Sequence, residues 1–254
     1  MEVYATVTDS RGEPVVGLPS EAFTVSEDGR PQTITAFAAG DAPLSLAIAV
    51  DRSFSVSRSQ LASVVRAVQQ VLGELRPGDC VSLIALGSSV DVLVPLTTDR
   101  RAVYDAVAGL APWGSTPLFD ATVAAIASVQ QGTGRRALLL ITDGVDRYST
   151  GTAAELIEAA RTQDVLIYPV VLSRAPAPVL VELAAVTGGH AHAVPEARAL
   201  GPSLSMIARE LRHQYLLGYA PADAAGPSRW RSITVRVSSP GAHVRARDGY
   251  VAGR

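Results

Sequence analysis

The chain has very little of several features that mark common protein classes. Cys80 is the only cysteine among 254 residues, so no disulfide can form within the chain. Lysine is absent, and the 22 arginines against 24 acidic residues leave a net charge of −2, which argues against a nucleic-acid-binding protein. No apolar run approaches the roughly 20 residues that span a membrane. We expect no signal peptide either, although an exported protein that had lost one would have the same sequence.

Two common catalytic motifs are also missing. The sequence has no Gly-x-Ser-x-Gly turn to present a nucleophilic serine, and no phosphate-binding loop ending in Gly-Lys. No histidine is expected near the serines discussed below, so a serine nucleophile would lack its base. We therefore expect that the protein is not an enzyme. Its 48% hydrophobic and 18% charged residues are typical of a globular protein.

The chain divides into three parts by its hydrophobic pattern. Residues 1–42 contain short alternating segments between Gly and Asp turns, including residues 15–18, which predicts strands. Residues 43–212 alternate short apolar runs with helical patterns, which predicts an α/β domain with a mostly parallel sheet. Within it, residues 90–96 follow a strand after only three residues, so they are expected to form an antiparallel edge strand. Residues 213–254 return to strand patterns at 215–219, 233–237 and 244–250.

The strands of the two ends are expected to join. Three or four strands bury too little surface to be stable alone. Residues 1–42 carry seven acids and two arginines, whereas residues 209–254 carry eight arginines and three acids, so the ends have opposite charges of −5 and +5. We therefore expect a small β-sandwich formed by residues 1–42 and 213–254, with the α/β domain inserted between them.

Oxygen-bearing side chains occur in three predicted loops of the α/β domain. Asp51, Ser53 and Ser55 follow one buried strand, Asp143 follows another, and Thr116 lies in a loop before a helix. Ligands of open α/β sheets bind beyond the carboxyl ends of the strands. Two neighbouring carboxylates repel unless a cation lies between them. Because these ligands are all hard oxygens, we expect Mg²⁺, or Mn²⁺ or Ca²⁺, rather than Zn²⁺.

Each of these residues also has a simpler explanation. Asp51 and the two serines are favoured helix N-caps, and Asp143 before a glycine is a common turn. Asp120, one turn after Thr116, is expected to begin a helix or to support the site rather than to bind metal. Asp146 is expected to be solvated.

The histidines and the tryptophans are two further groups of candidate site residues. His190 and His192 share one face of an expected edge strand, but no third ligand has matching spacing, so we expect a histidine pair without metal. Trp113, beside the Thr116 loop, is expected either to pack inward or to lie at the rim of the site. Trp230 is expected to pack within the sandwich.

At the candidate metal-binding residues the chain resembles the von Willebrand factor type A family. That family has an Asp-x-Ser-x-Ser segment after its first strand, a threonine in a later loop and an aspartate after its fourth strand. Together they form a metal-ion-dependent adhesion site. The resemblance covers roughly residues 42–212 and implies a Rossmann-like, doubly wound, mostly parallel sheet with one antiparallel edge strand. The matching positions are Asp51, Ser53, Ser55, Thr116 and Asp143.

The two ends of the chain add to this resemblance. They look like the ends of bacterial proteins related to the same family, many of which are predicted to be exported, so a cell-envelope or secreted location is implied. The family often has a small residue at the position of Phe54, so Phe54 would place an aromatic ring at the rim, and Arg52 is a second departure. The segments that carry the likeness are 25–29, 32–37, 215–219 and 247–250.

Three functions are compatible with this reading. The first is a divalent-cation-dependent protein-binding or adhesion module, in which an acidic residue of the partner completes the coordination of the metal. The second is a structural or interaction domain that binds through the β-sandwich and retains a relic metal site. The third is a metal-dependent hydrolase, which the absence of a general base beside the metal disfavours.

Overall fold

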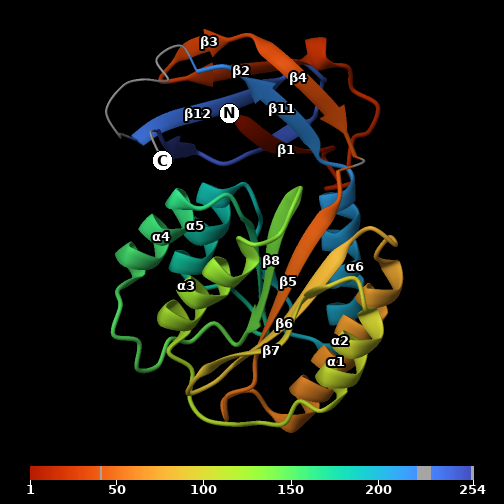
Figure 1. The fold of residues 1–254 in the computed structure, drawn as a ribbon, viewed down its shortest axis with the longest axis vertical. Helices are drawn as coiled ribbons and strands as arrows, with labels where there is room; N and C mark the ends of the chain where they lie inside the picture. The colour runs from red at the N-terminus through yellow and green to blue at the C-terminus, as the bar shows by residue number, and fades with distance from the viewer. Residues whose placement is uncertain (41, 222–229, 253–254) are drawn as a thin grey trace.

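The computed structural model describes residues 1–40, 42–221 and 230–252, which form a β-sandwich and a larger central domain (Figure 1). One end of the chain gives the sandwich β1 (Glu2–Thr8), a short 3-10 helix (Ser20–Ala22), β2 (Phe23–Glu27), β3 (Arg30–Gln32) and β4 (Ile34–Ala39). The other end gives β11 (Tyr215–Tyr219), β12 (Trp230–Val237), β13 (His243–Arg245) and β14 (Gly249–Val251). The two sheets have the strand orders β13-β1-β11-β4 and β14-β12-β2-β3, so each sheet contains strands from both ends, as predicted.

The core of the sandwich follows from the alternation of its strands. Val3, Ala5 and Val7 of β1 point inward with Phe23 and Val25 of β2. Aromatic rings fill the centre, where the Phe23 ring lies 4.9 Å from that of Tyr215. On β2 alternate residues are buried, as a half-buried strand requires, whereas β1 is buried on both faces because Tyr4 packs against the central domain.

A buried ion pair also joins the two ends. The carboxylate of Glu27 on β2 accepts hydrogen bonds from Arg231 Nη1 at 2.6 Å, Tyr219 Oη at 2.7 Å and Tyr250 Oη at 2.9 Å. Burial alone would raise the pKa of Glu27, but these three hydrogen bonds outweigh it and lower that pKa. The opposite charges of the two ends therefore meet at this point inside the sandwich.

Three details of the sandwich differ from the sequence-based prediction. Residues 244–250 form two strands, β13 and β14, which pair with different sheets. The chain changes sheets because Arg247 donates to the carbonyls of Gly249 and Arg161 and turns toward the central domain. Residues 15–18 form no strand. Trp230 is partly exposed and lies against Arg161 of the central domain, 5.4 Å from its guanidinium carbon, rather than inside the sandwich.

The central domain contains a six-stranded sheet with the order β10-β9-β8-β5-β6-β7. All neighbouring pairs are parallel except β6 and β7, which confirms the mostly parallel sheet with one antiparallel edge strand. The strands are β5 (Leu44–Asp51), β6 (Cys80–Leu86), β7 (Val90–Thr97), β8 (Arg135–Thr142), β9 (Leu166–Val171) and β10 (His192–Ala193). The helices are α1 (Arg58–Glu74), α2 (Arg100–Ala108), α3 (Leu118–Val129), α4 (Ala153–Thr162), α5 (Pro178–Thr187) and α6 (Ala197–Arg212).

Helices cover both faces of this sheet. On β5, Leu46, Ile48 and Val50 pack with α1, α2 and α6, whereas Ala47 and Ala49 pack on the opposite face with α3, α4 and α5. Every residue of β5 is buried, which explains why this strand reads as an apolar run rather than as an alternating one. Within the described residues, no helix has the length and apolar character needed to cross a membrane.

The chain enters and leaves the central domain at neighbouring points. Gly40 N, before β5, donates to Gln214 O, after α6, at 3.0 Å. Buried polar side chains also join the two domains here: Tyr168 Oη donates to Glu210 at 2.7 Å, and Arg245 of β13 forms an ion pair with Glu210 at 2.6 Å. Since β5 begins at this joint and advances about 3.3 Å per residue, its last residue, Asp51, lies roughly 23 Å away at the far end of the domain.

Candidate functional site

Asp51 is the centre of the candidate site. It ends β5 and is only 1% exposed. Its Oδ1 accepts hydrogen bonds from Ser53 N at 2.9 Å and from Thr116 Oγ1 at 2.8 Å. Its Oδ2 accepts one from Thr142 Oγ1 at 2.8 Å. Donors from three separate loops or strand ends therefore converge on one buried carboxylate, and Thr116 lies where the sequence-based hypothesis requires it.

Thr142 is a site residue that the sequence reading missed. The register pairs Val50 with Ile141, so the next residues, Asp51 and Thr142, lie side by side at the carboxyl ends of neighbouring strands. Thr142 Oγ1 also accepts a hydrogen bond from Gly144 N at 3.0 Å, which orients its hydroxyl proton toward Asp51. The sequence feature that could have identified Thr142 is a hydroxyl residue directly before Asp143, at the end of an apolar strand.

The serines after Asp51 do not cap the following helix. Helix α1 is capped by Ser57, whose side chain accepts from Gln60 N in a reciprocal capping box. Ser53 is buried and Ser55 is exposed, and their hydroxyl oxygens lie 2.9 Å apart. The N-cap explanation is therefore wrong for Asp51, Ser53 and Ser55, and another reason is needed for their convergence.

Asp143 follows Thr142 directly, at the same end of the sheet. Its Oδ1 accepts a hydrogen bond from Val145 N at 3.0 Å, so the simple turn explanation applies to this oxygen. Within the described part of the chain, no donor lies within hydrogen-bond distance of Oδ2. Gly144 has a φ of +85°, and a Cβ there would lie 2.8 Å from Val171, so this turn requires glycine. One oxygen of Asp143 is therefore used by the turn, and the other remains open to a ligand.

Two further aspartates hold the loop after β8 in place. Asp120 accepts hydrogen bonds from Thr150 N at 2.8 Å and Gly151 N at 2.9 Å, and these bonds lower the pKa of Asp120. Asp120 lies in the first turn of α3, which confirms its predicted place at a helix start, and its carboxylate also holds this loop. Asp146 was predicted to be solvated, which is wrong: it is half-buried and accepts from Phe119 N at 3.2 Å and Ser149 Oγ at 2.5 Å.

Exposed apolar side chains surround the candidate site. Phe54 is 74% exposed and Tyr148 is 81% exposed, and Trp113 is also exposed. Two backbone hydrogen bonds join the loops that carry Phe54 and Trp113. Phe54 N donates to Gly114 O at 3.0 Å, and Trp113 N donates to Arg52 O at 2.7 Å. Arg52 lies over the Trp113 ring at 5.1 Å and forms an ion pair with Asp91, so Trp113 is fixed at the rim rather than packed inside.

The side chains at this end of the sheet fit a divalent cation by their chemistry. Each of them offers an oxygen atom as a metal ligand. The hydroxyl of Thr116 donates its hydrogen bond to Asp51, so the lone pairs of the Thr116 oxygen remain available to a cation. Within the described residues, no arginine forms an ion pair with the buried Asp51 carboxylate, and a buried charge without a partner is costly. A cation held there would balance Asp51 and Asp143 together. These ligands suit Mg²⁺, Mn²⁺ or Ca²⁺.

The other sequence-based metal candidate has no such support. The rings of His190 and His192 lie 4.8 Å apart, edge to face. Burial, with the neighbouring His190 and Arg245, lowers the pKa of His192 to about 4, so this ring is neutral. Among the residues that the structure describes, no group of three or more His, Cys, Asp or Glu side chains is arranged to hold a metal. The candidate site around Asp51 therefore depends on its hydroxyl groups.

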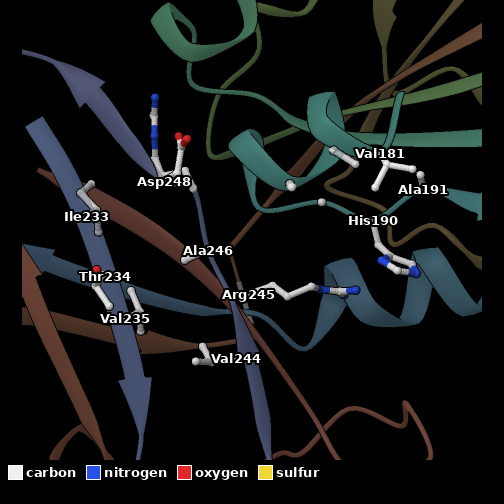
Figure 2. A pocket seen from close by; sticks show the side chains of 14 residues that line it. Val181, His190, Ala191, Ile233, Thr234, Val235, Val244, Arg245, Ala246 and Asp248 are labelled. Atoms are coloured by element: carbon white, nitrogen blue, oxygen red, sulfur yellow. The ribbon is translucent and has the colours of Figure 1, made fainter. Parts of the chain in front are cut away.

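A cavity of about 410 Å³ lies between α5 and the sandwich, and it is lined by residues later in the sequence than those of the site around Asp51 (Figure 2). Its lining includes His190 from the central domain and Thr234 and Arg245 from the sandwich. Arg245 extends from β13 toward the central domain, where Glu210 neutralises it. None of the candidate metal-binding residues lines this cavity.

Comparison with known proteins identifies the central domain. Residues 46–145 match the family described as von Willebrand factor type A domain. The central domain therefore has the fold of a von Willebrand factor type A domain. The matched segment includes Asp51, Ser53, Ser55, Thr116 and Asp143, and it ends two residues after the last of them. A search of curated proteins found no significant match.

Solved structures share the fold of this type A domain at low sequence identity. An aerotolerance-related membrane protein from Bacteroides fragilis is 18% identical, with a TM-score of 0.54 over 66% of this chain and 98% of the other. PilB minor pilin from Streptococcus sanguinis is 13% identical, with a TM-score of 0.55 over 72% of this chain and 63% of the other.

One structural likeness extends over the sandwich as well. A protein described as von Willebrand factor type A from Catenulispora acidiphila is 14% identical, with a TM-score of 0.61. The alignment covers 99% of this chain and 63% of the other, so this chain corresponds to only part of that protein.

Proposed function

We propose that the protein is a divalent-cation-dependent protein-binding module. In this proposal Asp51, Ser53, Ser55, Thr116 and Asp143 hold Mg²⁺, Mn²⁺ or Ca²⁺ directly or through water. An acidic side chain of a protein partner completes the coordination. The observation that supports it best is the convergence of Thr116 and Thr142 on the buried carboxylate of Asp51.

The charges of the site favour an acidic partner. Two aspartates balance a doubly charged ion, while the three hydroxyl ligands are neutral. A carboxylate from outside would add strong coordination at little electrostatic cost, since no further acidic ligand from this chain is part of the set. The exposed rings of Phe54, Trp113 and Tyr148 would contact apolar parts of the same partner.

Calorimetric titration with Mg²⁺ tests the metal site. We expect saturable binding at one site in the wild type and none in Asp51→Ala. Asp105→Ala is the matched control, because Asp105 is an exposed carboxylate on α2 that pairs with Arg101, and this variant should bind Mg²⁺ like the wild type. Equal binding by wild type and Asp51→Ala, or no binding by either, would contradict the proposal.

Selection from a displayed peptide library tests the partner. Peptides selected on the Mg²⁺-loaded wild type should contain an Asp or Glu whose change to Asn or Gln abolishes binding. They should be released by EDTA and should fail to bind Asp51→Ala. Peptides that bind equally well in EDTA would instead assign binding to another surface, such as the β-sandwich.

A further inference from the structure

A second surface beside the candidate metal site has its own recognition chemistry. A groove of about 620 Å³ lies between α1 and the end of α2. Its floor is apolar and includes Leu61, Val65 and Pro112. Among the described residues, the charged ones that line it are Arg58 and Arg66, and none is acidic. The groove therefore combines an apolar floor with positive charge at two points.

The two arginines have no carboxylate to neutralise them within the described chain. Arg66 donates to Ser63 Oγ at 2.9 Å, a neutral acceptor on the neighbouring groove between α1 and α6, so its charge stays unbalanced and its guanidinium must turn from Ser63 to reach a ligand in this groove. Some other exposed arginines of the central domain, such as Arg101, are paired with an acid of this chain. Arg58 and Arg66 are thus available to carboxylates of another molecule.

The groove adjoins the candidate metal site. Arg58 is the first residue of α1, three residues after Ser55. Pro112 precedes Trp113, which lies at the rim of the site against Arg52. A partner that places an acidic side chain on the cation would therefore continue over this groove as it leaves the site.

We propose that the groove binds an extended peptide segment of the partner with the pattern acid-x-apolar-x-acid. Eight helical residues separate Arg58 from Arg66, which is about 12 Å along α1. In an extended chain, residues four apart lie roughly 13 Å apart and point the same way. The two acids then reach the two arginines, and the apolar residue midway between them lies over Leu61 and Val65.

The location of this segment next to the metal rests on the proposed function, but its recognition by the groove does not require metal. A suitable probe is the blocked peptide Ser-Glu-Ser-Leu-Ser-Glu-Ser, compared with a permuted peptide in which the two Glu are adjacent. Binding is followed by NMR through the backbone amide shifts of α1 and residues 108–111, in EDTA.

Arg58→Gln/Arg66→Gln is the test variant, because Gln keeps the helix propensity of α1 while removing both charges. Arg11→Gln/Arg174→Gln, at exposed positions far from the groove, is the matched control for the loss of two charges. We expect saturable shifts at the groove for wild type, control and Asp51→Ala alike. Affinity should fall about fivefold or more for the test variant and for the permuted peptide.

Two results would overturn the inference. One is the absence of saturable shifts with low-millimolar peptide, or equal affinity of wild type and the test variant. The other is binding that requires both Mg²⁺ and Asp51, since the acids would then bind the metal rather than the arginines; that result would support the proposed function. If the peptide binds the groove in EDTA while calorimetry detects no Mg²⁺ binding, the groove proposal is supported and the proposed function is contradicted.

Discussion

Replacing Arg231 by methionine should strongly destabilise the sandwich. Arg231 is 2% exposed and Glu27 is 5% exposed, so the change leaves a carboxylate buried without its cation. Breaking a buried ion pair by removing one partner typically costs about 3–5 kcal/mol. Because Tyr219 and Tyr250 still donate to Glu27, we expect the lower end, about 3 kcal/mol. If the chain unfolds as one unit, Tm should fall by roughly 6–12 °C.

The loss of stability in Arg231→Met should also become smaller at acidic pH. In the wild type the pKa of Glu27 is lowered from its ordinary value of 4.5, so the stability that this group contributes is present above that value and is lost as pH falls through the folded pKa. Without Arg231, one hydrogen bond and one neighbouring positive charge that lower the pKa of Glu27 are lost, so that pKa should be higher than in the wild type, and protonation relieves the unpaired charge. The difference in stability between wild type and Arg231→Met should therefore narrow as pH falls below about 4.5.

Urea unfolding followed by far-ultraviolet circular dichroism at pH 7 and pH 4 measures both effects. Arg236→Met is the matched control, because Arg236 is exposed on the same strand, and it should change stability by less than about 0.5 kcal/mol. The double variant Glu27→Gln/Arg231→Met should recover part of the loss. The reasoning is refuted if Arg231→Met unfolds within about 1 kcal/mol of wild type at pH 7, or if the difference grows on acidification.

Three further predictions concern the candidate site. Mg²⁺ at about 100 times its Kd should stabilise the wild type by about 2.7 kcal/mol and raise Tm by roughly 5–10 °C. In thermal denaturation, Mg²⁺ should not change the Tm of Asp51→Asn. A Tm shift equal to that of the wild type would contradict metal binding at Asp51. Thr142→Val removes the donor to Asp51 Oδ2 with little change in shape and should weaken Mg²⁺ binding about tenfold by calorimetry; unchanged affinity would show that this hydroxyl does not matter. Phe54→Ser should leave Mg²⁺ affinity unchanged but weaken binding of selected acidic peptides by fluorescence anisotropy, and the reverse pattern would place Phe54 in the metal site rather than at its rim.

Much of the central domain is predictable from short-range patterns. Strands buried on both faces, such as β5 and β8, read as apolar runs, and the three-residue connection after β6 allows only an antiparallel neighbour. The placement of Asp51 and Asp143 at one edge of the sheet follows from the rule that parallel strands end at the same edge. These features need only local periodicity and loop length.

The features that sequence reasoning missed depend on register and on contacts between distant segments. Thr142 becomes a site residue because β8 pairs with β5 in one particular register, which periodicity does not reveal. Asp146 accepts a hydrogen bond from a backbone amide of α3, Phe119 N, which lies 27 residues earlier. Residues 244–250 split into two strands because Arg247 bonds to the central domain, and Trp230 contacts Arg161 there.

The neighbouring positions of the two connections between the domains have a mechanical consequence. The backbone bond between Gly40 and Gln214 ties the chain together where it enters and leaves the central domain, while Asp51 lies at the opposite pole. Tension between a partner held at Asp51 and an anchor at the sandwich would therefore run lengthwise along β5. The hydrogen bonds of β5 to β6 and β8 would then be loaded in shear, all at once, rather than unzipped one after another.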